Sequence, residues 1–282
     1  MRFTPAFYRF AAVCSFISAI TTLGLIFLPG MLTPAEDFAG RMARVNDPLY
    51  QLYAWVYFVH PFLVVAAALG VAMRLRREAT SLVIPGLVAF LLWGATEAGQ
   101  QALTLFAFNP WRLAWLAGDP VVRATMEVRT AMYDGVWNAM YFLLIVGFFF
   151  ANVLYAVALW RRRGLSRVVG ALYAAAAALT LQIIIVELGG GQLLPEAIDF
   201  WVYPLIQPLA RTLIGVWLWT HRNENEASGP ALGIEPRRLP RPGPPPAVQH
   251  TLESAATDGH QLLRVSIVFA TLNHLCRPSR SS

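Results

Sequence analysis

The chain has 282 residues, of which 57% are hydrophobic and 13% are charged, and its mean hydropathy is +0.51. These proportions exclude an ordinary soluble domain, in which about 25% of the residues are charged. The net charge of +6 rests on 22 basic residues, all of them arginines. The arginines stand in short loops and form no basic face interleaved with aromatic residues, so we expect no nucleic-acid partner.

Long apolar stretches predict helices that span a lipid bilayer, because a hydrocarbon core of about 30 Å needs roughly 20 apolar residues per crossing. The first stretch is too long for the core of a signal peptide and lacks a small-residue cleavage site, so we expect a retained helix. The predicted helices cover residues 8–29, 50–73, 81–106, 132–160, 167–188 and 200–220. The predicted fold is therefore all-α: a polytopic membrane protein with a six-transmembrane-helix bundle in residues 1–221.

The arginines also predict the orientation of the bundle. They gather in the loops after the second and the fourth helix, which hold few acidic residues: Arg74, Arg76, Arg77, Arg161, Arg162, Arg163 and Arg167. The positive-inside rule places these loops, and with them both termini, in the cytoplasm. The segments 36–44 and 112–129 would then be outer loops. Short interfacial helices that cap the vestibule are one interpretation of these segments, but we favour solvated loop structure.

Beyond residue 221 the composition changes to polar residues, proline and arginine. Such a segment cannot bury enough apolar surface to form a core. We therefore predict that residues 222–282 form a disordered cytoplasmic tail.

The last predicted helix is unusually polar. Four polar residues recur in it at every fourth position: Asp199, Tyr203, Gln207 and Arg211. This spacing places them along one slowly drifting face of a helix. Pro204 and Pro208 lie in the same helix, and each frees the backbone carbonyl four residues earlier. A proline-broken helix with a buried arginine is typical of a binding site in a membrane, and equally of a packing kink.

Other polar side chains lie at a similar depth in the outer halves of the helices. Glu97 and His60, like Arg211, fall roughly 14–16 Å from the outer ends of their helices at 1.5 Å per residue. Four further amides lie in the outer parts of helices three, four and five: Gln100, Gln101, Asn138 and Gln182. These positions predict a water-filled vestibule that opens to the outside and is closed at mid-depth by a Glu97–Arg211 ion pair.

A purely structural role explains part of this pattern as well. For the four amides we favour interhelical hydrogen bonds, which contribute about 0.6 kcal/mol each, over a site. His60 precedes Pro61 and fits either a satisfied core histidine or a proton-handling group. Full charges are more costly, at about 2.5–3.5 kcal/mol on insertion scales, so Arg211 and Glu97 favour a functional site, with a structural salt bridge as the alternative.

The last helix also carries a resemblance to a known group of proteins. The run Tyr203-Pro204-Leu205-Ile206-Gln207-Pro208-Leu209-Ala210-Arg211, continued by Leu213-Ile214-Gly215-Val216-Trp217-Leu218-Trp219, resembles six-span bacterial integral membrane proteins of a domain of unknown function. Helix count and loop rhythm extend the resemblance to about residues 8–220. It implies a multi-pass protein of the bacterial inner membrane and transfers no activity.

No catalytic or cofactor motif is present. The sequence has no Walker loop, G-x-G-x-x-G, G-x-S-x-G or H-E-x-x-H, and Cys14 and Cys276 are too few for a thiolate metal site or a disulfide framework. We therefore expect no cofactor and no metal. The leading interpretation is an outward-facing vestibule that binds or transports a small polar or anionic solute. The alternatives are a structural or sensory membrane module, and a membrane-embedded enzyme that uses Glu97 or His60. The sequence leaves the oligomeric state open.

Overall fold

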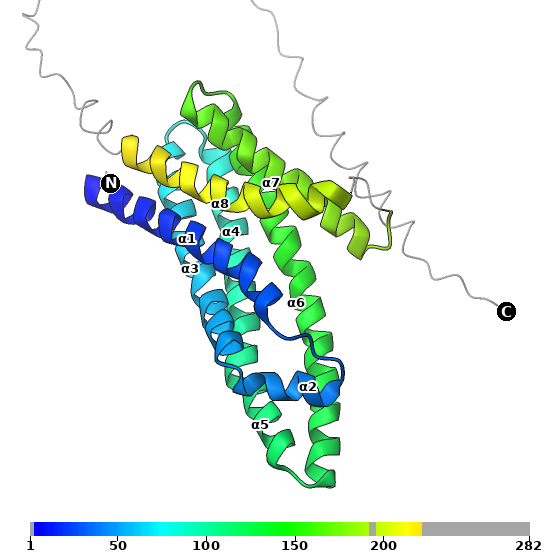
Figure 1. Ribbon diagram of the computed structural model, residues 1–282. Helices are drawn as coiled ribbons and strands as arrows, with labels where there is room; N and C mark the ends of the chain where they lie inside the picture. Colours follow the sequence, from blue (N-terminus) through cyan, green and yellow to red (C-terminus); the bar gives the residue numbers. More distant parts are fainter. Residues whose placement is uncertain (1–2, 192–195, 222–282) are drawn as a thin grey trace, which may run out of the picture. The chain divides into compact units, whose positions relative to one another are not determined.

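A computed structural model describes residues 3–191 and 196–221, and the predicted tail lies outside them (Figure 1). Within the described residues the chain is helical and contains no β-strand. The long helices are α1 (Pro5–Met31), α3 (Pro48–Leu75), α4 (Thr80–Leu103), α6 (Pro120–Trp160), α7 (Leu165–Glu187) and α8 (Glu196–Thr220). The short elements are α2 (Phe38–Ala43), η1 (Arg44–Asn46), the π-helical turn η2 (Thr104–Phe108) and α5 (Asn109–Ala117).

Five helices in the described part of the chain are long and apolar enough to cross a membrane. They are α1, α3, the continuous helix Thr80–Ala117, α6 and α7. The prediction of an all-helical, multi-pass membrane protein is thereby confirmed. The sixth crossing, by α8, stays a prediction.

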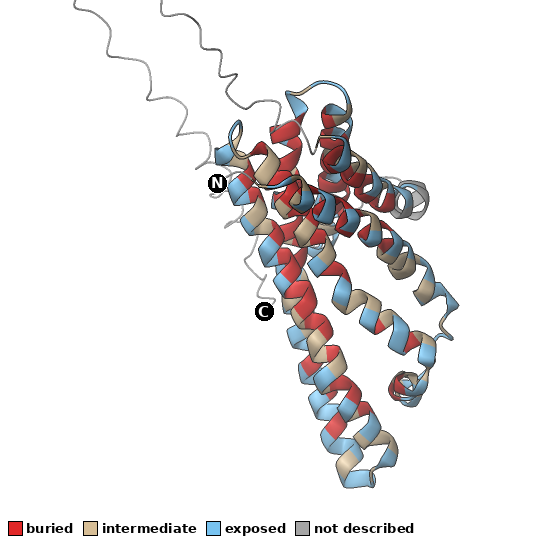
Figure 2. Ribbon diagram, turned by 90° about the vertical axis from the view of Figure 1, so that its left-hand side faces the viewer, coloured by how far each residue is buried: buried red, intermediate tan, exposed pale blue. Residues whose placement is uncertain are grey.

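The six long helices contact one another in a closed cycle. Each neighbours the next in the order α1, α3, α4, α6, α7 and α8, and α8 returns to α1. Their buried positions face inward, and their exposed positions face outward (Figure 2). Any space left at the centre of this cycle is therefore enclosed by all six helices.

One end of the bundle is tightly packed. We call it the terminal end, because α1 begins there and α8 ends there. Its core combines large side chains such as Tyr155 and Trp217 with small ones. A Cβ atom added to Gly70 would lie 2.6 Å from Cβ of Ala11, and one on Gly86 would lie 2.6 Å from the ring of Tyr155. Small residues thus let the helices approach closely here, as is typical of helix contacts in membranes.

Hydrogen bonds between helices fix the same end. The Tyr155 hydroxyl donates to the backbone carbonyl of Ala68 at 3.0 Å, which joins α6 to α3. The Trp217 indole nitrogen donates to the Ser166 hydroxyl at 2.8 Å, which joins α8 to α7. The buried polar atoms of these aromatic residues are therefore paired, as they must be away from water.

At the opposite end of the bundle, the segments predicted to be solvated outer loops are largely helical. Segment 36–44 contains the helix α2, and segment 112–129 contains the end of α5 and the first turns of α6. The α4 helix continues through η2 into α5, because the wide π-turn precedes Pro110, whose nitrogen cannot donate to the carbonyl of Phe106. Asp119 then caps α6 by accepting from the backbone nitrogens of Val121 and Val122, both at 2.9 Å.

The helix α6 is unusually long, because its first turns lie in the segment that was predicted to be a loop. Its 41 residues span about 60 Å at 1.5 Å per residue, twice the thickness of the hydrocarbon core. The helix α5 packs against α6, and α2 packs against α5. The end opposite the terminal end therefore carries a helical cap of two short helices, α2 and α5.

Candidate functional site

The polar residues of the helices meet around a central cavity of about 270 Å³. All six long helices contribute to its walls. Its polar lining includes Thr22, His60, Glu97, Thr180, Gln207 and Arg211. Four of these residues were predicted from the sequence. They come from α3, α4 and α8, so the closed cycle of helices is what brings them together.

Glu97 and Arg211 share the central cavity, but they do not close it as a pair. Within the described residues the Glu97 carboxylate makes no ion pair with Arg211, contrary to the predicted salt bridge. The Arg211 guanidinium instead lies 6.0 Å from the ring centroid of Phe148, at the limit of a cation–π contact. The Ser15 hydroxyl donates to the backbone carbonyl of Arg211 at 2.6 Å and so holds this turn of α8 against α1.

His60 has a defined orientation in the cavity wall. Its Nδ1 lies 2.8 Å from the Thr21 hydroxyl, which also donates to the carbonyl of Ser18 at 3.1 Å. Because Thr21 has one hydroxyl proton, this arrangement assigns Nδ1 of His60 as the donor and Nε2 as the basic nitrogen. The ring of Trp93 stands edge-on to the imidazole at a centroid distance of 6.3 Å.

Other predicted residues lie elsewhere. Gln100 donates to the backbone carbonyl of Trp137 at 2.9 Å, so this amide links α4 to α6. Gln182 is buried in α7 but does not line the central cavity. Asn138 is exposed, because the inward stripe of α6 passes through Trp137, and the next residue is turned by about 100°. The Tyr203 side chain lies outside the described residues.

Gln101 lines a second space, which we call the aromatic cavity, of about 280 Å³. Its walls come from α2, α3, α4, η2, α5 and α6 and include the rings of Tyr50, Tyr53, Tyr57, Phe108, Tyr133 and Trp137. Tyr53 and Tyr57 line the central cavity as well. The two cavities are therefore adjacent and share a wall of α3.

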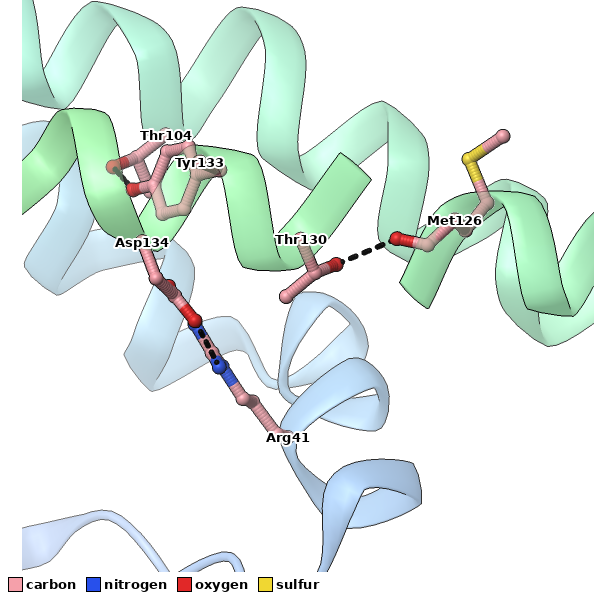
Figure 3. Close-up of polar contacts among 6 residues, drawn as sticks. All are labelled: Arg41, Thr104, Met126, Thr130, Tyr133 and Asp134. Atoms are coloured by element: carbon pink, nitrogen blue, oxygen red, sulfur yellow. Dashed lines mark hydrogen bonds and ion pairs between the residues drawn. The ribbon is translucent and has the colours of Figure 1, made fainter. Parts of the chain in front are cut away.

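An ion pair attaches the cap to the bundle beside the aromatic cavity (Figure 3). The Arg41 guanidinium of α2 donates to both carboxylate oxygens of Asp134 in α6, at 2.9 and 2.5 Å. Hydrogen bonding to Asp134 raises the pKa of Arg41 above its ordinary value. Next to this pair, the hydroxyls of Tyr133 and Thr104 lie 2.8 Å apart, and Phe108 stacks on Tyr133 at a centroid distance of 4.2 Å.

Arg112, in α5, is a buried cavity-lining residue that the sequence analysis did not single out. Its side chain is 4% exposed and lines the aromatic cavity. The guanidinium donates to the Asn109 side chain at 3.1 Å and lies 4.2 Å from the ring centroid of Phe108 and 4.8 Å from that of Tyr50. The spacing of Phe108, Asn109 and Arg112 at i, i+1 and i+4 is the signal that would have indicated a helix with these contacts.

A shallow groove of about 400 Å³ lies on the outside of the aromatic cavity. Residues 35–38 line it together with Arg41, Arg44 and Arg112. Arg41 and Arg112 belong to the groove and to the aromatic cavity alike. The groove and the aromatic cavity therefore share two lining residues, and the aromatic cavity and the central cavity share two others, Tyr53 and Tyr57. The three spaces form a series from the surface to the centre of the bundle.

Among the described residues, no group of three or more His, Cys, Asp and Glu side chains is close enough to hold a metal ion. Comparisons with protein-family models, with curated proteins and with solved structures found no match to the chain. The resemblance of the last helix to a six-span bacterial family therefore stays a prediction. The geometry of the cavities is the basis for a function.

Proposed function

We propose that the chain is a six-span membrane protein that binds a small polar or anionic solute in the central cavity and passes it between the cavity and one side of the membrane. One observation carries the proposal: a cavity enclosed by six helices collects His60, Glu97, Gln207 and Arg211. Its volume of about 270 Å³ lies just below the usual range of ligand pockets, about 300–1,000 Å³, so the solute is small.

The charges in the cavity favour a solute over a structural salt bridge. Each charged side chain in a membrane span costs about 2.5–3.5 kcal/mol on insertion scales. A direct ion pair would offset part of that cost, but Glu97 and Arg211 do not form one within the described residues. Glu97 therefore needs another source of stabilisation, which a hydrated cavity that admits solute supplies. The Arg211 guanidinium is the arginine in the lining of this cavity, and it is the group that we expect to attract an anionic solute.

The loops support an orientation in which the cavities open outward. The arginine-rich turns 76–79 and 161–164 adjoin the ends of α3 and α6 at the terminal end, where residues 3–9 also lie. The positive-inside rule assigns this end to the cytoplasm and the cap to the outer side. A solute from outside then reaches the central cavity past the groove and the aromatic cavity. The resemblance of the last helix to six-span bacterial proteins supports a location in the bacterial inner membrane.

Ligand-dependent unfolding of the protein in mild detergent tests the proposal. Acetate serves as an anionic probe, and glycerol serves as a neutral polar probe. A probe at one hundred times its Kd stabilises a folded protein by about 2.7 kcal/mol, which raises the Tm of a chain of this size by roughly 5–10 °C. We expect one of the probes to raise the Tm of the wild type in this way.

Single substitutions in a common background show which arginine is responsible for the stabilisation by the anionic probe. All variants carry Arg112→Gln, which removes the other buried arginine that lines a cavity, so that acetate is tested at the central cavity alone. In this background Arg211→Gln should lose the stabilisation by acetate, and Arg161→Gln should keep it, because Arg161 is an exposed arginine at the terminal end. Equal stabilisation by acetate with and without Arg211→Gln would place the anion elsewhere. The complete absence of stabilisation by either probe would favour a structural or sensory module.

A further inference from the structure

The aromatic cavity contains buried hydrogen-bond donors that have no acceptor. The Nε atom of Arg112 and the side-chain nitrogen of Gln101 are both buried, and neither has a hydrogen-bond partner among the described residues. The two side chains are 4% and 3% exposed and come from different helices, α5 and α4. Buried donors are normally paired, so two orphans that line one cavity point to an acceptor that enters it.

The charges of the aromatic cavity do not balance either. Arg41 is neutralised by both oxygens of Asp134. Arg112 contacts the neutral side chains of Asn109, Tyr50 and Phe108 and forms no ion pair with a carboxylate in the described part of the chain. The lining therefore carries one uncompensated positive charge. A buried cation needs a counter-charge, and a single one suffices here.

We propose that the aromatic cavity is a binding site for an organic monocarboxylate, whose oxygens accept from Arg112 and Gln101. A carboxylate supplies one negative charge and two acceptor oxygens, which match the one free charge and the donors on two helices. Phosphate carries more charge than the lining compensates. The rings of Tyr50, Tyr53 and Trp137 offer apolar surface to the rest of the ligand, which makes an apolar or aromatic body the better fit.

Access to this site comes from the groove beside α2. Arg112 and Arg41 line both spaces, and Arg44 adds a further cation in the groove, where its Nε atom is also without a hydrogen-bond partner. Glu36 and Asp37 also line the groove, so its surface is of mixed charge, and the attraction for an anion comes from Arg112 in the aromatic cavity. The site does not include Arg211, Glu97 or His60. It stands whether or not the central cavity binds a solute.

Calorimetric titration of the full chain in non-ionic detergent tests the proposal with a matched pair of probes. Benzoate carries the carboxylate on an aromatic body, and benzamide has nearly the same shape without the charge. We expect saturable binding of benzoate, at least tenfold weaker binding of benzamide, and no binding of phosphate. Equal affinity for benzoate and benzamide would overturn the proposal, because the charge of Arg112 would then play no part.

Three variants assign the binding to the cavity. Arg112→Gln and Gln101→Leu should each weaken benzoate binding, by roughly tenfold or more for the charged contact. Arg123→Gln is the matched control, because Arg123 is an exposed arginine of α6 that stacks on Trp115 and does not line the cavity. If Arg112→Gln does not fold, Gln101→Leu decides alone. Unchanged benzoate affinity in Gln101→Leu and in any folded Arg112→Gln protein would refute the assignment.

Two further arms separate this site from the central cavity and identify the source of the carboxylate. Arg211→Gln should bind benzoate like the wild type, so a failure of the proposed function leaves this result intact. Decanoate, a fatty acid, tests a membrane source. Binding of decanoate that depends on Arg112, without binding of benzoate, would support a lipid-derived carboxylate. No Arg112-dependent binding of either acid would overturn the proposal.

Discussion

The two ends of the helix bundle differ in the side chains between the helices. At the terminal end Ala11, Ala12, Ala68 and Ala72 are almost fully buried, and a few large aromatic residues fill the space between them. Toward the cap, tyrosines, arginines and amides take the inward positions and line cavities of about 270 and 280 Å³. The same helices therefore form a dry contact at one end and hollow, polar surfaces at the other.

This difference separates two tasks along one set of helices. Small residues allow close backbone approach, which seals the bundle against water and provides much of the packing. Bulky polar residues hold the helices apart and leave room for water or a solute. We infer that the terminal end determines the stability of the protein, whereas the cavity end determines what it binds.

The largest expected change in stability comes from overpacking the terminal end. Gly70→Ala places a Cβ atom 2.6 Å from Cβ of Ala11, which has no flexible side chain that could move away. We expect a loss of about 1–3 kcal/mol in the free energy of unfolding, seen as a fall of several degrees in Tm.

The matched control is Gly135→Ala in α6. A Cβ atom there meets nothing within 4 Å, so the substitution should be neutral or stabilising by up to about 1 kcal/mol through helix propensity. A Gly70→Ala protein as stable as Gly135→Ala would show that the terminal end is not tightly packed.

Neutralising the charges of the central cavity should affect stability less. Glu97→Gln removes a buried charge that forms no ion pair with Arg211, so we expect it to be neutral or to stabilise by about 1–2 kcal/mol. Arg211→Gln is the second single variant, and its effect should be independent of the charge of Glu97. The double variant should equal the sum of the single variants within about 0.5 kcal/mol. Thermal or denaturant unfolding of the four proteins in detergent measures this coupling.

The competing explanation predicts the opposite result. If the two charges were structural, each single variant would lose stability and the double variant would recover much of the loss. A coupling energy above about 1 kcal/mol would therefore remove the main support for a solute site at Arg211.

The sequence predicts four residues that line the central cavity, His60, Glu97, Gln207 and Arg211, because they lie in long periodic helices. Period and depth alone placed Arg211, Glu97 and His60 at one level, and the closed cycle of helices then brings them to one space. What they could not predict is the separation of Glu97 from Arg211, or the rotation of Asn138 out of the stripe of α6. Those details depend on how two helices pack, to within a fraction of a turn.

The aromatic cavity could not be predicted, for a different reason. The mixture of acidic residues and arginines made residues 112–129 resemble a solvated loop, whereas Arg112 lies in a continued helix and is buried between the rings of Phe108 and, from α3, Tyr50. The π-turn before Pro110 has no reliable sequence signature. The pairing of Arg41 with Asp134 joins residues 93 positions apart, which one sequence does not specify.

A smaller effect is expected where the cap joins the bundle. Arg41→Gln removes the ion pair with Asp134, whose partners are 35% and 41% exposed, so the global free energy of unfolding should fall by less than about 1 kcal/mol. The local effect should be larger, because this pair ties α2 to α6. We expect faster amide hydrogen exchange in residues 38–46 and unchanged exchange in α7. Uniform changes across the bundle, or none in α2, would contradict this role.

The smallest effect on stability is expected for single cysteine substitutions at the surface. Labelling of these cysteines in intact bacterial cells tests which end of the bundle faces outward. Single cysteines at Ala79, in the turn before α4, and at Ala117, the exposed last residue of α5, probe the terminal end and the cap in a background with Cys14 and Cys276 replaced by alanine. The positive-inside rule predicts that a membrane-impermeant maleimide reacts with Ala117→Cys in intact cells, and with Ala79→Cys only after permeabilisation. The reverse pattern would turn the groove, the aromatic cavity and Arg112 toward the cytoplasm. The packed end would then seal the bundle against the outside, and any solute would reach the central cavity from within the cell.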